Sequence, residues 1–267
     1  MGKLEEHSYI FNDQAEDQEL ARLRFVEAAF DPRTVSLLEQ IGIGQGDRCL
    51  ELAAGGGSIA RWMGQRVGAR GVVTSVDLKT IYLKDLAHPP YRVVEGDAGQ
   101  VDVGSDYDVA HCRYMLIHHP DPGTVLRRAY ATLRPGGHIL LEEPDFSISR
   151  ALAGTSDGSQ RVNEAIQLWF EQQGLDPAFG ITLPDLAAQI GFHIVSVEAD
   201  GHLCSGKSPV AKVMGASIAS LREKYVATGV ASEEDIQAYV EDAEHEDAWS
   251  HYYTTVRVVA RKPETSS

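Results

Sequence analysis

The stretch CLELAAGGGSIARWMGQRV, residues 49–67, carries the clearest structural pattern in this sequence of 267 residues. Its first four residues predict a short buried strand, and residues 58–67 predict a helix. Three consecutive glycines join the two, and glycine lets a backbone turn sharply with no Cβ in the way. The first N–H groups of a helix have no partner within it, so they can bind a ligand. The stretch therefore predicts a strand, a tight turn and a helix, with a ligand site at the turn.

The sequence on both sides of this unit alternates between strand and helix patterns. The predicted strands cover residues 72–77, 91–97, 107–112, 138–143, 193–199 and 254–262, and helices are predicted at 124–133 and 183–190. Asp121 is expected to cap the helix at 124–133, and Pro135 to Gly137 to end it. Alternation with short connections is typical of α/β proteins, in which helices cover both faces of a mostly parallel sheet.

Further helices are predicted before and after this alternating part. Residues 1–44 are expected to form N-terminal helices, one over Leu20 to Phe30 and a second that Asp31 and Pro32 begin and Gly42 ends. Two helical insertions are predicted at the ranges 146–180 and 205–248, where they could cap the carboxyl edge of the sheet. Because no repeat or long linker divides the sequence, residues 1–267 are predicted to form a single domain.

The composition of the chain limits the classes of partner that it is expected to bind. The sequence has 24 Lys and Arg against 39 Asp and Glu, a formal net charge of −15, which disfavours nucleic acids and anionic membrane surfaces as partners. Its three cysteines, Cys49, Cys112 and Cys204, are far apart and show no CxxC spacing, which favours a reducing compartment. No signal peptide or run of eighteen apolar residues occurs. We therefore expect a cytoplasmic protein with a small-molecule partner.

The glycine turn is compatible with several nucleotides. Gly55-x-Gly57-x-x-Ala60 satisfies a relaxed dinucleotide fingerprint, and Asp77 follows at the end of the next strand, where a carboxylate can accept both ribose hydroxyls. Alternatively, these glycines could form a tight turn between strand and helix that binds no ligand.

Two more acids distinguish between these ligands. Glu51 precedes the glycines, where its charge would repel a pyrophosphate but suit an ammonium or sulfonium group. Asp97 ends the third strand and could accept a hydrogen bond from an adenine amino group. With Asp77, these acids indicate a cationic adenosyl ligand.

With these acids and glycines in place, residues 49–145 resemble the class I S-adenosylmethionine-dependent methyltransferases. Ala53 stands where the family usually has the first glycine of its motif. The resemblance implies a doubly wound, Rossmann-like sheet of seven strands whose last strand, at 254–262, is antiparallel. It also implies S-adenosylmethionine as cofactor. The cofactor-binding residues that it implies are Glu51, Ala53, Gly55, Gly57, Asp77, Leu78, Asp97, Ala98, Cys112 and Arg113.

Side chains that follow the fourth and fifth predicted strands could serve as a catalytic base or as metal ligands. His118 matches a histidine common in the family and could remove a proton from the methyl acceptor, or it could only shape the entry to the next helix. Glu142, Glu143 and Asp145 could join His118 around a substrate amine or a divalent ion. Because these acids cluster on one segment, we expect no metal ion.

The sequence thus predicts a methyltransferase acting at O, N or C of a small metabolite. One alternative keeps the fold and cofactor but catalyses a cyclisation or rearrangement, or only binds the ligand. Another is a nicotinamide-dependent oxidoreductase, although no Tyr-x-x-x-Lys pair occurs. The apolar insertions indicate a fairly hydrophobic acceptor or, alternatively, a homodimer interface.

Overall fold

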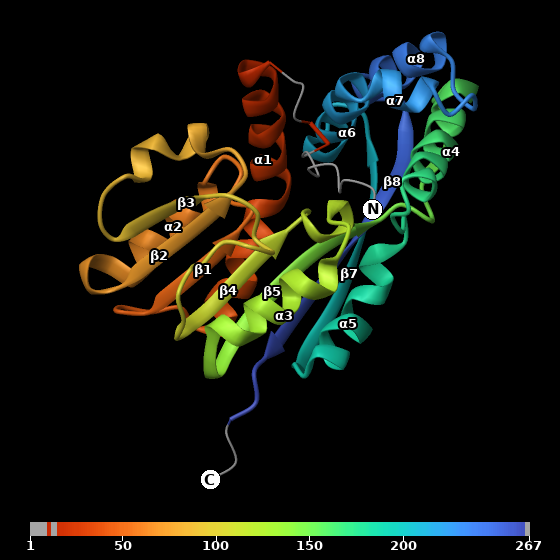
Figure 1. Ribbon diagram of the computed structural model, residues 1–267. Coiled ribbons are helices and arrows are strands. Elements are labelled where there is room, and N and C mark those ends of the chain that lie inside the picture. The colour runs from red at the N-terminus through yellow and green to blue at the C-terminus, as the bar shows by residue number, and fades with distance from the viewer. Residues whose placement is uncertain (1–9, 12–14, 265–267) are drawn as a thin grey trace, which may run out of the picture.

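A computed structural model describes residues 10–11 and 15–264 of the chain, and a single sheet runs through it (Figure 1). Its strands pair in the order β3-β2-β1-β4-β5-β8, and β6 and β7 both pair with β8. The strands are β1 Arg48–Leu52, β2 Val72–Asp77, β3 Tyr91–Glu95, β4 Tyr107–Arg113, β5 Leu133–Asp145, β6 Arg150–Ala151, β7 His193–Ser205 and β8 Trp249–Arg261. The pairs among β1 to β5 are parallel, and β8 is antiparallel to its neighbours.

This topology confirms the Rossmann-like α/β fold with an antiparallel last strand. The seven predicted strands are present, and the two-residue β6 is an eighth that the sequence pattern did not indicate. β7 and β8 are each 13 residues long, longer than predicted, because they continue to pair as far as Ser205 and Trp249. Their extension carries the chain from the sheet to a group of helices above it.

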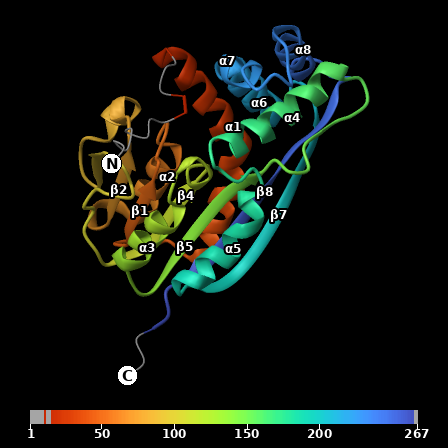
Figure 2. The same ribbon diagram turned by 45° about the vertical axis from the view of Figure 1, so that its right-hand side comes forward.

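Helices cover both faces of the sheet (Figure 2). The helices are α1 Glu16–Ile41, α2 Ser58–Val67, α3 Pro122–Thr132, α4 Asp157–Gln172, α5 Phe179–Ile190, α6 Pro209–Ser220, α7 Arg222–Val226 and α8 Glu233–Ala243, with short 3-10 helices η1 Gly68–Arg70, η2 Thr80–Leu86 and η3 Leu116–His118. α1 and α2 pack together on one face, and α3 and α5 pack together on the other. Among the described residues, no helix has the length and apolar character needed to cross a membrane.

The N-terminal region differs from the prediction, because α1 is one continuous helix through Pro32. A proline inside a helix removes one backbone hydrogen bond and normally breaks or kinks it. Here Phe30, Leu37 and Leu38, on either side of the proline, are almost completely buried. Burial of these side chains offsets the missing hydrogen bond, so the predicted break at Asp31 and Pro32 is wrong. The predicted end is confirmed: Gly42 takes φ 97° after the last turn.

Four helices form a cap beyond the carboxyl ends of the strands. α4, α6 and α7 each pack against α8 or against one another, and the upper part of α1 contacts α6. The range 146–180 contributes β6, α4 and the start of α5, whereas 205–248 contributes α6, α7 and α8. The acidic α8 begins with a capping box between Ser232 and Asp235, and it buries Ile236 and Tyr239 against the cap. The cap faces the glycine turn across a cavity.

Candidate active site

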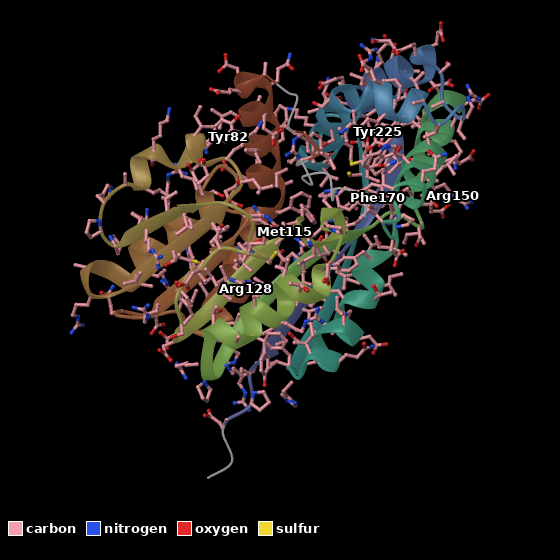
Figure 3. All side chains as sticks on the ribbon, in the orientation of Figure 1. Tyr82, Met115, Arg128, Arg150, Phe170 and Tyr225 are labelled. Atoms are coloured by element: carbon pink, nitrogen blue, oxygen red, sulfur yellow. The ribbon has the colours of Figure 1, made fainter. Side chains whose placement is uncertain are left out.

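A cavity of about 910 Å³ lies at the carboxyl ends of the parallel strands, between α1 and the cap. Figure 3 labels residues from both of its ends: Tyr82 on η2, Phe170 and Tyr225 on the cap, and Met115 just after β4. The cavity brings together most of the predicted site residues. Those that line it are Glu51, Ala53, Gly55, Asp77, Leu78, Asp97, Ala98, Arg113 and His118.

Two predicted cofactor residues do not line the cavity. Gly57 ends the turn as the N-cap of α2, with φ 79°, and an added Cβ there would sit 2.7 Å from Cδ2 of Leu83. It therefore serves the tight turn into α2. Cys112 is fully buried on β4, and this burial raises the pKa of its thiol well above the usual value. The structure thus places both residues behind the cavity wall.

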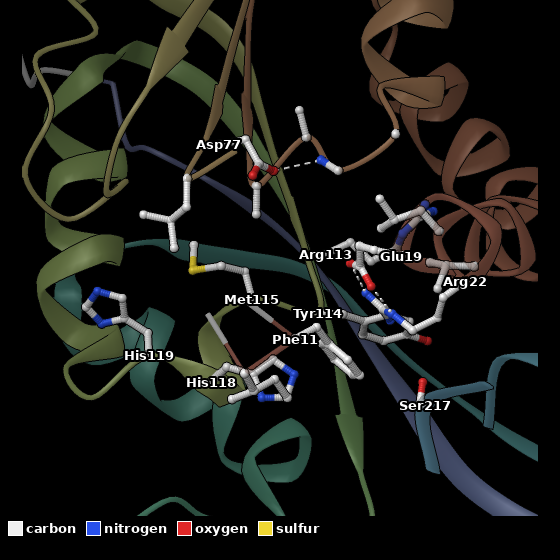
Figure 4. A pocket seen from close by; sticks show the side chains of 18 of the residues that line it. Phe11, Glu19, Arg22, Asp77, Arg113, Tyr114, Met115, His118, His119 and Ser217 are labelled. Atoms are coloured by element: carbon white, nitrogen blue, oxygen red, sulfur yellow. Dashed lines mark hydrogen bonds and ion pairs between the residues drawn. The ribbon is translucent and has the colours of Figure 1, made fainter. Parts of the chain in front are cut away.

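Asp77 holds the glycine turn against β2. Its Oδ2 accepts a hydrogen bond from the Gly55 N–H at 2.8 Å, and its Oδ1 accepts one from the Lys79 N–H at 2.9 Å (Figure 4). Burial raises the pKa of Asp77, against the effect of these two hydrogen bonds. A carboxylate has about four lone-pair positions, so both oxygens can still accept from a ligand in the cavity.

Asp97 is oriented by the loop that follows β3. It accepts hydrogen bonds from the Gly99 N–H and from Nε2 of Gln100, both at 2.7 Å, and Nε2 of His119 lies 3.4 Å away. Burial alone would raise the pKa of Asp97, but the hydrogen bonds outweigh it and the pKa is lowered. Asp97 therefore presents a fixed negative charge to the cavity.

Glu51 has the least satisfied carboxylate in the site. It is only 3 % exposed, and its Oε2 has no hydrogen-bond partner. Its Oε1 lies 3.7 Å from Nδ1 of His111 on β4. A buried carboxylate oxygen without a partner is costly, and an ammonium or sulfonium group in the cavity would satisfy it. The residues present therefore fit a cationic adenosyl ligand.

A buried polar network continues from this site beneath the cavity. Oε1 of Glu142 lies 3.1 Å from Nε2 of His111 and accepts a hydrogen bond from the Thr34 hydroxyl. Its Oε2 accepts a hydrogen bond from Nε of Arg257 at 2.8 Å. Despite burial, His111, the charge of nearby Arg113 and the hydrogen bond from Thr34 lower the pKa of Glu142 to about 2. The network fixes the position of α1 relative to β4, β5 and β8.

Glu142, Glu143 and Asp145, which were predicted to follow the fifth strand, lie within the last residues of β5 and do not line the cavity. Glu143 accepts hydrogen bonds from the N–H groups of Met115, Leu116 and Ile117, and burial raises its pKa to about 8. Oδ1 of Asp145 accepts a hydrogen bond from the Ser147 N–H. Together with the role of Glu142, these contacts make the three acids part of the scaffold. Within the described ranges, no three His, Cys, Asp or Glu side chains are grouped as for a metal ion.

His118 lies at the end of the short helix η3, toward the cap. Its ring is half-buried against Phe170, with ring centroids 5.7 Å apart, and its Nδ1 has no hydrogen-bond partner. Burial, with smaller effects of the cationic Arg22 and Lys224, lowers the pKa of His118 to about 3. The imidazole is therefore neutral at neutral pH, and His118 is one of the residues that line the cavity.

Tyr114 is a lining residue that the sequence analysis missed. It follows β4 with φ 54°, a conformation that is rare for residues with a side chain. Its hydroxyl bonds the Thr255 hydroxyl at 2.6 Å, and its ring packs edge-on against Phe30. Its position directly after Arg113, at the carboxyl end of a parallel strand, was the available signal.

Glu19 and Arg22 line the cavity from α1. Arg22 donates two hydrogen bonds to the Glu19 carboxylate, at 2.8 and 2.7 Å, and its guanidinium lies 3.9 Å from the centroid of the Phe11 ring. Arg113 donates to Asp31 and to the Thr34 hydroxyl, each at 2.8 Å. The charges of both arginines are thus matched by neighbouring groups.

Comparisons with known proteins identify a family for this chain. Residues 20–197 match the family described as "Methyltransferase domain". The chain is 30% identical over 109 residues to a ubiquinone biosynthesis O-methyltransferase of Pseudomonas fluorescens. The aligned residues make up 38% of this chain and 45% of the relative. The chain thus spans about half the length of the first curated relatives that it matches.

Solved structures share the fold. A methyltransferase structure from Bacillus halodurans, itself of uncertain function, is 18% identical with a TM-score of 0.57, covering 86% of this chain and 98% of that one. A phosphoethanolamine N-methyltransferase from Haemonchus contortus, solved with phosphomonomethylethanolamine and S-adenosylhomocysteine, is 16% identical with a TM-score of 0.60. That match covers 97% of this chain and 60% of the other. The oxidoreductase alternative finds no support. Because the family match covers residues 20–197, more than half of its length, this chain belongs to the methyltransferase domain family.

Proposed function

We propose that this enzyme transfers the methyl group of S-adenosylmethionine to an oxygen, nitrogen or carbon atom of a small molecule. One observation carries the proposal: Glu51, Asp77 and Asp97, at the ends of β1, β2 and β3, all line one cavity. Ligands of open α/β sheets bind at this edge. The acids fit a cationic ligand with a ribose and an adenine better than a pyrophosphate.

Each acid has a proposed contact. Asp77 would accept hydrogen bonds from the ribose hydroxyls, and Asp97 one from the adenine amino group. Glu51, with its unpartnered Oε2, would receive the positive charge of the methionine portion. Ala53, Gly55, Leu78, Ala98 and Arg113 would surround the cofactor, whereas Gly57 and Cys112 would support this wall from behind.

The protein contributes to the reaction mainly by holding the acceptor atom in line with the methyl group. The bound cofactor supplies an activated methyl group on a sulfonium, and little covalent help is needed for its displacement. Holding the acceptor atom in line with a reacting group is worth effective molarities of about 10⁵ to 10⁸ M. The cap helices α4, α6 and α7, which line the cavity, would hold the acceptor and exclude water.

His118 is the proposed polar contact for the acceptor. A base is most effective when its pKa is near the working pH, and the pKa of His118 is lowered to about 3. The neutral imidazole would therefore orient the acceptor by a hydrogen bond and accept its proton only as the new bond forms. Among the described residues, the other buried ring nitrogen without a hydrogen-bond partner is Nδ1 of His111, which lies 3.7 Å from Glu51 in the proposed cofactor site.

Partners and location are also proposed. The net charge of −15 supports a small-molecule substrate over a nucleic acid. All three cysteines are unpaired as thiols, which supports work in the reducing cytoplasm. A homodimer stays a prediction.

Calorimetry with S-adenosylhomocysteine tests the cofactor site. Asp77→Ala should weaken binding by roughly 10- to 100-fold, the usual worth of hydrogen bonds to a charged group. Asp85→Ala is the matched control, because Asp85 is an exposed acid on η2 that pairs with Arg61 outside the cavity. Equal affinity of the Asp77 variant and the wild type would refute the ribose contact. Transfer itself is tested with a labelled methyl donor and candidate acceptors, where turnover without label would favour a cyclisation or rearrangement.

A further inference from the structure

The cavity has two chemically different ends. The end at β1, β2 and β3 carries the acids of the proposed cofactor site. The other end is formed by side chains of the cap and of the strands beneath it, which we call the cap chamber. Its apolar and aromatic members are Phe146, Ile166, Phe170, Val213, Met214, Ile218, Leu221, Tyr225 and Tyr253. In Figure 4, Ser217 of α6 and His118 approach this end from opposite sides, well away from Asp77.

The cavity extends beyond the acids of the proposed cofactor site. Ligand pockets typically hold about 300 to 1,000 Å³, and this one has about 910 Å³. With the cofactor placed over the acids, the cap chamber remains for the acceptor.

The cap chamber offers no positive charge of its own for an anionic acceptor, and the two unpartnered carboxylate oxygens at the cavity, of Glu27 and Glu51, lie at the glycine turn. Among the described residues, the lysines and arginines that line the cavity are Arg22, Lys79 and Arg113. Arg22 is matched by Glu19, and Arg113 by Asp31. Lys79 follows β2 at the cofactor end. A carboxylate or phosphate in the cap chamber would therefore lose its hydration without gaining a matching charge.

One polar atom near the cap chamber, a ring nitrogen of His118, has no hydrogen-bond partner. Nδ1 of His118 is buried and has no hydrogen-bond partner, and the ring is neutral at neutral pH. Such a nitrogen suits a hydroxyl, which can both donate and accept a hydrogen bond. Ser217 adds a second hydroxyl group to the same end of the cavity.

From these observations we propose that the cap chamber binds a neutral acceptor with a large apolar body and a hydroxyl group directed toward His118. This inference rests on the proposed function, since it names the substrate class of the same site. The reaction is then an O-methylation: the hydroxyl oxygen bonds the methyl carbon as the carbon–sulfur bond breaks. The sulfur keeps the electron pair of that bond, and the hydroxyl proton leaves to His118 or to water.

Binding of simple phenols to the wild-type protein tests this class. Calorimetry is run with 4-methyl-, 4-ethyl-, 4-propyl- and 4-butylphenol, each with and without S-adenosylhomocysteine. Because a buried methylene is worth about 0.8 kcal/mol, affinity should rise up to about 4-fold with each one. Two charged phenols are compared with 4-ethylphenol: tyramine, which adds an ammonium group, and 4-hydroxyphenylacetate, which replaces the methyl group by a carboxylate. Both should bind at least 10-fold more weakly.

Results that would overturn this inference differ from those that would refute the proposed function. An affinity independent of chain length, or tighter binding of either charged phenol than of 4-ethylphenol, would overturn the inference. Failure of S-adenosylhomocysteine to bind while the phenols follow the expected series would instead refute the proposed function and leave the cap chamber's preference intact.

A pair of variants locates the phenol in the cap chamber. Met214→Gln places an amide of similar size in the chamber and should weaken 4-butylphenol binding about 10-fold, with the affinity for S-adenosylhomocysteine unchanged. Ile181→Gln is the matched control, because Ile181 is 58 % exposed on the outer side of α5. Unchanged phenol binding in a folded Met214→Gln protein would place the phenol elsewhere and overturn the inference. If that variant does not fold, the wild-type series decides.

Discussion

Glu51 and His111 face each other across two neighbouring parallel strands, with Oε1 of Glu51 3.7 Å from Nδ1 of His111. The register of β1 and β4 sets the two residues side by side, and both are nearly fully buried. His111 also contacts Glu142 on its other side. The imidazole thus lies between two carboxylates, one at the cavity and one beneath it.

The charge of His111 should make part of the stability depend on pH. Burial alone lowers the pKa of His111, but its hydrogen bond to Glu142 and the nearby carboxylate of Glu51 raise it above the usual value. The stabilisation is therefore complete below the unfolded pKa of about 6.5 and is lost as the pH rises through the raised folded value. Urea denaturation should show a larger difference in the free energy of unfolding between wild type and His111→Gln at pH 6 than at pH 9. A difference that grows with pH would contradict this assignment.

His118 should show the opposite dependence. Its pKa is lowered to about 3 in the folded protein, against about 6.5 when unfolded. Stability from the neutral imidazole is present above pH 6.5 and is lost as the pH falls toward 3, by at most about 1.4 kcal/mol per pH unit. The stability of the wild type relative to His118→Gln should thus be greater at pH 7.5 than at pH 4.5. Equal relative stability at the two pH values would mean that His118 titrates normally.

Glu142 should be far more important for stability than a surface glutamate in a similar pair. Glu142→Gln leaves Arg257 buried beside a neutral group, and breaking a buried ion pair costs about 3 to 5 kcal/mol. The control is Glu198→Gln, which breaks the partly exposed pair between β7 and Arg33 of α1 and should cost at most about 1 kcal/mol. Thermal and urea denaturation of both variants measure the difference. Similar losses in both would show that the buried network is not a major support of the fold.

The glycine turn should respond in opposite directions at two positions. Ala53 has φ 57°, a left-handed conformation that costs a residue with a Cβ about 1 to 2 kcal/mol. Ala53→Gly should therefore stabilise the protein by about 1 kcal/mol. Gly57→Ala should destabilise it by at least as much, because the new Cβ would also clash with Leu83. Urea denaturation gives both values, and a loss of stability in Ala53→Gly would show that the strain at this turn is relieved elsewhere.

Local sequence signals predicted the elements that local interactions determine. The predicted ranges of α2 and β2 agree with the structure, because a glycine turn and short apolar runs limit them. The lengths of β7 and β8 were underestimated, since pairing between residues 44 to 55 positions apart, from Ser205 with Trp249 to Asp200 with Thr255, extends both strands past their apolar cores. The continuity of α1 through Pro32 likewise depends on burial against distant parts of the chain.

The same distinction applies to the site. Parallel strands end at a common edge, so the positions of Glu51, Asp77 and Asp97 along their strands were enough to bring them to one cavity. The direction of a side chain at a strand end is harder to predict. Glu142 and Glu143 were expected near His118, yet one bonds Arg257 and the other bonds the backbone before His118. Such partners come from distant segments and leave no local pattern.

The late position of β8 in the chain affects how the protein can fold during synthesis. β8 lies between β5 and β7 and follows every other strand in the sequence, so the sheet stays divided while the ribosome is still making residues 146–248. Until then Glu142 lacks Arg257, and β5 presents an unpaired edge of the kind that promotes aggregation. The nascent chain therefore passes through a stage at which β1 to β5 can pair but β8 cannot yet join them to β7. A chaperone would be most useful at that stage.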